Sequence, residues 1–119
     1  MATDLDLLRD FFRHGSQEAF TALVRRNLPL VYSAALRQVR SHHLAEEVAQ
    51  SVFIDLARMA EQLKPDTLLS SWLYTVTYRT AVDVIRTEVR RRALEQVATE
   101  MNPPQIRETT WQEIGTRFG

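Results

Sequence analysis

The stretch SWLYTVTYRTAVDVIRTEVRRR, residues 71–92, runs for more than twenty residues without glycine or proline. Its apolar residues recur every three or four positions, which predicts one long helix. At about 100° per residue, five of its side chains fall within roughly 60° of one another: Trp72, Arg79, Asp83, Arg86 and Arg90. Four others have the spacing of a buried face: Leu73, Val76, Thr80 and Val84. The stretch therefore predicts a helix with one face for a core and one for a polyanion or stacked rings.

The rest of the chain also has helical periodicity. It has only three glycines and no Asn-Gly or Asp-Gly turn between alternating apolar residues. We expect an all-α fold, a compact bundle of about four to five helices. The first helix is expected over 4–13, capped by Thr3 or Asp4 and ended by Gly15.

Proline and cap residues set the remaining boundaries. Ser16 is expected to cap a second helix that breaks or kinks at Asn27–Pro29 and continues over 30–40. Ser41 is expected to cap a third helix over 43–62, which has a broad apolar arc. The arc contains Val48, Val52, Leu56, Met59, Ala60 and Leu63. Residues 64–71 read as a loop, and the long helix is expected to end near Ala98.

Composition places bounds on the class of protein. A chain of 119 residues is long enough for one domain with its own core, and no apolar run approaches the ~20 residues that cross a bilayer. The N-terminus has no signal-peptide pattern, so we expect a cytoplasmic protein without membrane insertion. The chain has no cysteine, and its histidines (His14, His42 and His43) have no ligand spacing. We expect no metal and no cofactor.

The charge is neutral overall but uneven along the chain. Residues 1–71 carry 8 basic and 9 acidic side chains, residues 72–98 carry 5 and 3, and residues 99–119 carry 2 and 3. The positive excess therefore lies on the long helix, which is a weak footprint of a polyanionic partner. No phosphate loop, metal-protease pair of histidines or cysteine nucleophile points to an enzyme.

Two surfaces are candidates for binding. On the long helix, Arg86, Arg90 and Arg91 can contact phosphates, and its aromatic side chains can stack on unpaired bases. The aromatic set is Trp72, Tyr74 and Tyr78. The alternative is that these rings belong to the core or a hinge and that the arginines are a solvated face.

The third helix offers the other candidate. Ile54 lies in its polar arc, close to Glu47 and Gln50 around the helix. It is either a stray exposed apolar residue or an apolar anchor ringed by carboxylates, suited to a basic protein partner.

Taken in order, the motifs resemble region 2 of the extracytoplasmic-function group of bacterial sigma-70 factors. The segments that carry the likeness are LLRDFFRHGSQEAFTALVRR with VYSAALRQV, then LAEEVAQSVFIDLARMA at 44–60, then the stretch 71–92. The likeness covers about residues 4–97. It implies a sigma-70 region 2-like fold that docks on the clamp helices of the largest subunit of core RNA polymerase. It also implies recognition and melting of the promoter −10 element, without catalysis by this chain.

The resemblance assigns roles residue by residue. The polymerase-binding set is Glu46, Glu47, Gln50 and Ile54. The DNA-binding set is Trp72, Tyr74, Tyr78, Arg79, Arg86, Arg90 and Arg91. The loop 63–71 corresponds to the place where such factors hold a flipped base.

The sequence also departs from that family. Arg79 stands where the family usually has asparagine, and His42, His43 and Leu44 replace acidic residues before the docking helix. The second DNA-binding domain is missing, so we expect a region 2-like domain over 1–98 and a linker, or the start of that domain, over 99–119. The chain is expected to be a fragment or a shortened product. The alternative function is a protein-interaction module, a decoy or ligand for an anti-sigma factor, with no promoter function of its own.

Overall fold

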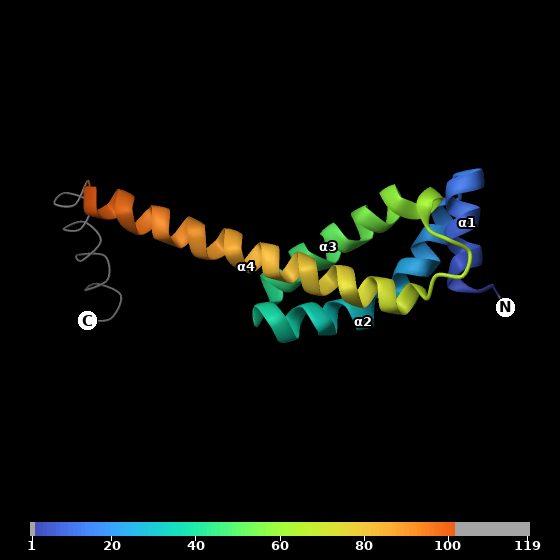
Figure 1. Ribbon diagram of the computed structural model, residues 1–119, viewed down its shortest axis with the longest axis horizontal. Coiled ribbons are helices and arrows are strands. Elements are labelled where there is room, and N and C mark those ends of the chain that lie inside the picture. The colour runs from blue at the N-terminus through green and yellow to red at the C-terminus, as the bar shows by residue number, and fades with distance from the viewer. Residues whose placement is uncertain (1, 102–119) are drawn as a thin grey trace. The chain divides into compact units, whose positions relative to one another are not determined.

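The computed structural model describes residues 2–101, which are helical with short connections (Figure 1). The elements in chain order are α1 (Asp4–His14), α2 (Gln17–Val39), α3 (His42–Met59), the 3₁₀ helix η1 (Ala60–Gln62) and α4 (Leu69–Met101). These residues contain no strand. The expected all-α fold is confirmed.

Side-chain caps fix the starts of the first three helices. Thr3 forms a capping box with Asp6, in which the Asp6 amide donates to Thr3 Oγ1 at 3.1 Å and the Thr3 amide donates to Asp6 Oδ2 at 3.0 Å. Ser16 and Ser41 accept from backbone amides in the first turns of α2 and α3. Gly15 ends α1 at φ 64°, a left-handed conformation that favours glycine.

Several expected boundaries differ from the structure. Pro29 lies inside a continuous α2, so the expected break there is wrong, while a bend remains a prediction. The third helix changes to 3₁₀ geometry at Ala60. The last helix begins at Leu69, two residues early, because Leu69 is buried in the core and is held by the same helical turn as Leu73. It also extends past Ala98 to Met101.

The core forms where α2 packs on both α1 and α3, and the first part of α4 adds to it. Its fully buried side chains are Leu23, Val31, Val48, Val52, Leu56, Leu73 and Thr77. Met59, expected to face inward, is exposed, because it lies at the end of α3 where the helix tightens. Phe12 is also exposed, and α1 is buried mainly through Leu8.

The chain divides into two compact units, residues 1–85 and 86–119. The first contains α1, α2, α3 and α4 up to Ile85. Of the second, the structure describes the helical residues 86–101, none of which is buried. The expected domain limit near residue 98 remains a prediction. The possible helix over 108–114, with Trp111, and the nearby Phe118 lie outside the described residues.

Candidate functional site

The outer face of α3 brings together the four residues assigned to a protein partner. Glu46, Glu47, Gln50 and Ile54 are all exposed and lie within roughly 100° of the helix circumference. Ile54 keeps 52% of its surface exposed, which is high for an isoleucine in the middle of a helix. Glu47 Oε1 lies 3.2 Å from Nε2 of His43, one turn earlier. The face therefore carries two carboxylates and one exposed apolar side chain.

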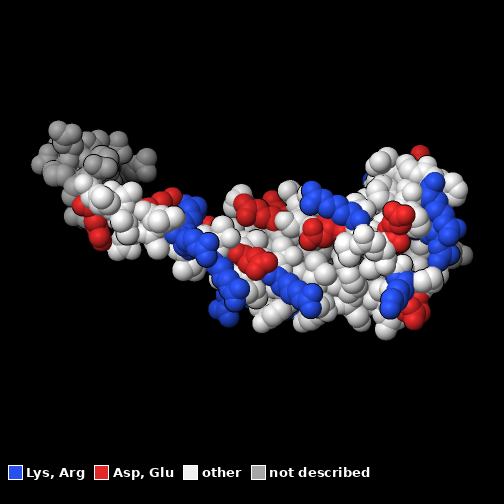
Figure 2. Space-filling view, turned by 45° about the horizontal axis from the view of Figure 1, so that its top comes forward, with Lys and Arg blue, Asp and Glu red and all other residues white. Residues whose placement is uncertain are grey.

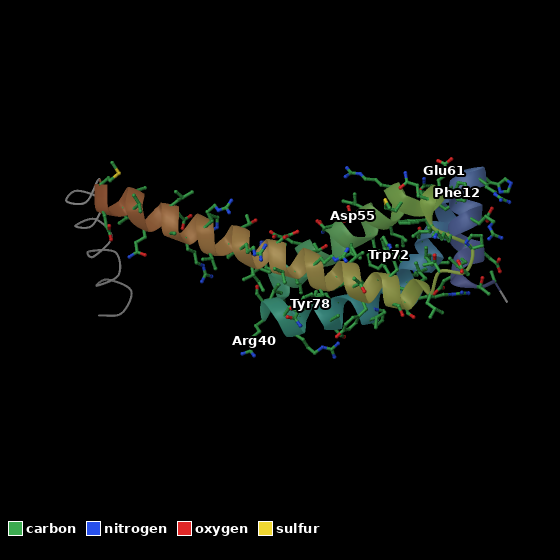
Figure 3. All side chains as sticks on the ribbon, in the orientation of Figure 1. Phe12, Arg40, Asp55, Glu61, Trp72 and Tyr78 are labelled. Atoms are coloured by element: carbon green, nitrogen blue, oxygen red, sulfur yellow. The ribbon has the colours of Figure 1, made fainter. Side chains whose placement is uncertain are left out.

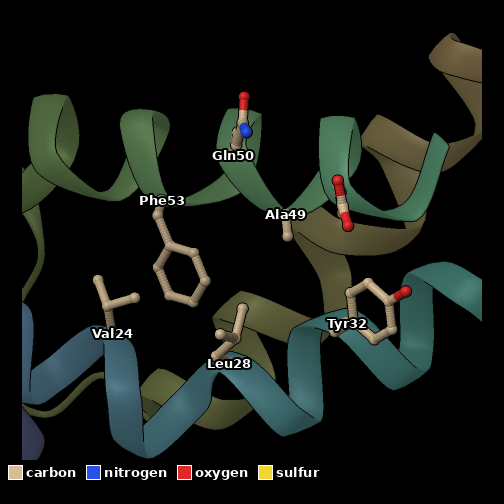
Figure 4. A pocket seen from close by; sticks show the side chains of 7 residues that line it. Val24, Leu28, Tyr32, Ala49, Gln50 and Phe53 are labelled. Carbon is tan, nitrogen blue, oxygen red and sulfur yellow. The ribbon is translucent and has the colours of Figure 1, made fainter. Parts of the chain in front are cut away.

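An apolar groove borders this face, between α2 and α3 (Figure 4). Its volume is about 430 Å³. Its lining residues are Val24, Leu28 and Tyr32 from α2 and Glu46, Ala49, Gln50 and Phe53 from α3. Glu46 and Gln50 thus belong to both the groove and the outer face, so one partner could contact the two together.

The sequence alone did not predict this groove. Leu28 was the available signal, because an apolar residue beside Pro29 falls outside the buried row of α2 and is left exposed. Tyr32 reaches the groove from α2, and a 2.7 Å hydrogen bond joins its Oη to Nδ1 of His42. That contact links two helices, and no periodicity in one helix could reveal it.

The aromatic residues of α4 lie on both flanks of its buried row. Trp72 is half-buried and packs against the core, on the same flank as Arg79 and Asp83. Tyr74 and Tyr78 are half exposed on the other flank, so Trp72 and Tyr78 point to different sides of α4 (Figure 3). The sequence alone leaves open whether these rings belong to the core. The structure places Trp72 against the core and the two tyrosines at the surface.

A hollow of about 450 Å³ adjoins Tyr74. Its walls come from Leu30 of α2 and from Ser70, Ser71, Tyr74 and Thr75 of α4. The early start of α4 puts Ser70 and Ser71 in its first turn. Three hydroxyl groups beside an aromatic ring can both donate and accept hydrogen bonds and can offer a stacking surface. This is chemistry that suits a planar polar group such as a nucleobase.

The arginines of residues 86–92 are of two kinds. Arg91 donates to Glu88 at 2.6 Å and also pairs with Glu95, while Arg92 Nε lies 3.2 Å from Glu88. The hydrogen bond from Arg91 lowers the pKa of Glu88, and the pairing with Glu88 raises the pKa of Arg91. Within residues 2–101, no carboxylate lies at ion-pair distance from Arg86 or Arg90. Those two guanidinium groups are therefore the more available for an anionic partner.

Two other site types receive no support from the described residues. Residues 2–101 contain no group of three or more His, Cys, Asp or Glu side chains arranged to hold a metal ion. Over the same range, every helix is too short or too polar to cross a bilayer.

Comparison with known proteins defines the class. Residues 23–91, which include α3 and most of α4, match the family model described as Sigma-70 region 2. The chain belongs to the sigma-70 region 2 family, in its extracytoplasmic-function branch.

Three curated relatives illustrate the likeness. RNA polymerase sigma factor CarQ of Myxococcus xanthus is 36% identical over 75 residues, 63% of this chain and 43% of CarQ. ECF RNA polymerase sigma factor SigK of Mycobacterium sp. (strain KMS) is 31% identical over 107 residues, 87% of this chain and 55% of SigK. ECF RNA polymerase sigma factor SigE of Mycolicibacterium smegmatis is 32% identical over 91 residues, 71% of this chain and 35% of SigE. The chain thus spans about half the length, or less, of these relatives. No solved structure matches it significantly.

Proposed function

We propose that this chain is a sigma factor domain that docks on core RNA polymerase through α3 and recognises and opens the promoter −10 element through α4. The observation that carries the proposal is that α3 and α4 of this sigma-70 region 2 domain expose different kinds of side chain. Glu46 and Glu47 share the outer face of α3 with the exposed Ile54, whereas exposed aromatic and arginine side chains lie on α4. The proposed site of action is the cytoplasm, where bacterial polymerase works.

The α3 face suits a basic, partly apolar protein surface. Glu46 and Glu47 offer charge complementarity, and Ile54 can act as an apolar anchor at the centre of the contact. The groove bordered by Gln50 adds apolar surface, lined by Phe53 and Leu28, for a neighbouring side chain of the partner. The clamp helices of the largest polymerase subunit are the partner that the family resemblance implies.

On α4 the proposed roles are divided by position. The hollow beside Tyr74 receives an extruded base, where stacking contributes about 1–3 kcal/mol per base. This offsets part of the cost of opening DNA, about 1.4 kcal/mol per step. Arg86 and Arg90 contact phosphates, a salt-dependent contribution. Trp72 and Arg79 form a second surface for the opened strand. Tyr78 extends the stacking surface that Tyr74 offers. No step in this scheme requires catalysis by the chain.

Charge and anchor substitutions test the docking face. Ile54→Asp or Glu47→Arg should reduce co-purification with core polymerase at least about tenfold, since removal of a central anchor costs that much or more. Leu68→Asp is the matched control for polymerase binding, because Leu68 is exposed before the start of α4 and is not part of the α3 face. If polymerase is retained by Ile54→Asp as well as by Leu68→Asp, the docking assignment is wrong.

A second arm tests the DNA contacts in the same complex. With polymerase present, binding of a single-stranded −10 oligonucleotide, followed by fluorescence anisotropy, should weaken in the double variant Arg86→Ala/Arg90→Ala. The slope of log binding constant against log salt concentration should also fall by about two, one for each lost phosphate contact. Arg13→Ala/Arg25→Ala, which removes two exposed arginines from α1 and α2, is the control. Equal binding by the two double variants would contradict the assignment.

A further inference from the structure

The described part of the second unit exposes a row of apolar side chains. Every residue from Val89 to Met101 is exposed, including four large apolar ones, each at least half accessible to solvent. They are Val89, Leu94, Val97 and Met101. Val89, Ala93 and Val97 follow one another at four-residue spacing and therefore share one face. An uncovered helix of this length is only marginally stable in water, so a partner that covers this face would stabilise it.

The ion pairs of the segment lie on the other side of the helix. Glu88, Arg91 and Glu95 are linked to one another, and all three lie at least about 120° around the helix from Ala93. The charges that are paired within the helix therefore lie on the side away from the apolar row. Arg86 and Glu100 lie beside that row instead, each within about 20° of Ala93 around the helix.

The charges also change sign along the segment. Residues 86–92 carry four arginines and one glutamate, net +3, whereas residues 93–101 carry two glutamates and no cation, net −2. Figure 2 shows the same order, with blue side chains gathered along the start of this segment and red ones toward its end. A helix with opposite charges at its two ends is complementary to a copy of itself running in the reverse direction.

We infer that residues 86–101 pair with the same segment of a second copy of this chain, in an antiparallel arrangement centred on Ala93. Val89 and Val97 lie about 40° to either side of Ala93, and Arg86 and Glu100 about 20° to either side. With Ala93 on the two-fold axis, Val89 packs against the partner's Val97, and Arg86 faces the partner's Glu100. Each contact occurs twice, as an interface between identical surfaces requires.

This register agrees with three separate features of the face. The smallest side chain, Ala93, stands at the axis, where the two helices approach most closely. The apolar pairs flank it, and the opposite charges come at the ends. Parallel pairing in register would instead place Arg86 against Arg86 and Arg90 against Arg90, which is repulsive.

Self-association would also compete with DNA, a consequence that rests on the proposed function. Arg86 would contact the partner copy in one state and phosphate in the other. The pairing itself is independent of that proposal, because it is measured without nucleic acid or polymerase. A monomeric chain that still binds the −10 oligonucleotide would overturn only the self-association, and the proposed DNA binding would stand.

Charge exchange is the first test, by sedimentation velocity of the full chain over a range of concentrations. Arg86→Glu and Glu100→Arg should each weaken dimerisation about tenfold, because each places like charges in contact. The double variant Arg86→Glu/Glu100→Arg should restore it. Val97→Asp should weaken it at least as much as either single change, with helicity checked by circular dichroism. A chain that is monomeric at all concentrations overturns the inference, and so does a dimer that none of these changes affects.

Cysteine cross-linking gives the direction, since the natural chain has no cysteine. Under oxidation, Ala93→Cys should form a covalent dimer, whereas Glu95→Cys, on the opposite side of the helix, should not. A mixture of Val89→Cys and Val97→Cys chains should form the mixed dimer in preference to either self-paired one. Preferential self-pairing of Val89→Cys would indicate parallel helices and overturn the antiparallel arrangement.

Discussion

Asn27 shows how one polar side chain joins two helices. It is buried, and its Nδ2 donates to the carbonyl of Leu23 at 2.8 Å and to Oδ2 of Asp4 at 3.2 Å. Asp4 also lies 3.4 Å from Arg26. Helical spacing alone places Asn27 one turn after Leu23. It could not predict the second partner, because Asp4 comes from α1.

Replacing Asn27 should therefore loosen the contact between α1 and α2. Asn27→Ala should lower the free energy of unfolding by about 1–3 kcal/mol, since Asp4 loses a buried donor. Urea titration followed by circular dichroism at 222 nm measures the change. Gln38→Ala, an exposed amide on the same helix, is the control and should stay within about 0.5 kcal/mol. Equal stability of the two variants would show that the Asn27 contact contributes nothing.

The aromatic rings of α4 show which part of the proposed DNA site the sequence could not predict. The sequence placed Trp72, Tyr74 and Tyr78 together as candidates for base contacts. Helical geometry already separates Trp72 from the tyrosines, but which flank is exposed depends on what packs against the helix. The hollow beside Tyr74 needs Leu30 of α2, so a reading of α4 alone could not reveal it.

At the scale of the element, local signals predicted where most helices start. Thr3, Ser16 and Ser41 cap the helices as expected, because a cap acts on amides only two or three residues away. The signals failed where tertiary packing overrides them. Pro29 does not end α2, since residues on both sides of it, such as Leu23 and Val31, are buried in one core.

The ion pairs of α4 predict an acid-sensitive helix end. Arg91 lowers the pKa of Glu88 below its ordinary value of 4.5. Because the pKa is lower in the folded state, the pair stabilises the helix above about pH 4.5, and this contribution is lost as the pH falls through the folded-state pKa. Ellipticity at 222 nm should therefore decrease slightly between pH 5 and pH 3 in the natural chain.

The matched variant isolates that contribution. Glu88→Gln removes the charge and should start with lower ellipticity at pH 7, with a smaller decrease on acidification than the natural chain. Thr87→Ser, at the neighbouring exposed position, should titrate like the natural chain. If Glu88→Gln shows the same acid transition as the natural chain, other carboxylates are responsible.

At the scale of the molecule, α3 has a buried side and an exposed side. Val48, Val52 and Leu56 are fully buried on one side, and Glu47 and Ile54 are exposed on the other. The apolar periodicity predicted the buried side, because it follows from spacing within one helix. The family resemblance assigned the exposed residues to polymerase docking, which stays a prediction. The apolar groove between α2 and α3 was not predictable in this way, since it requires the packing of two helices.

Because those two sides are separate, stability and docking should respond to different substitutions. Leu56→Ala opens a cavity in a fully buried position and should lower the free energy of unfolding by about 2–5 kcal/mol. The same substitution at Leu68, which is 73% exposed, should change it by no more than about 0.5 kcal/mol. Urea titration of both variants beside Ile54→Asp measures this, and Ile54→Asp should unfold like the Leu68 control while losing polymerase. If Ile54→Asp were as unstable as Leu56→Ala, its loss of polymerase would reflect unfolding, and the outer face of α3 would have no demonstrated role in docking.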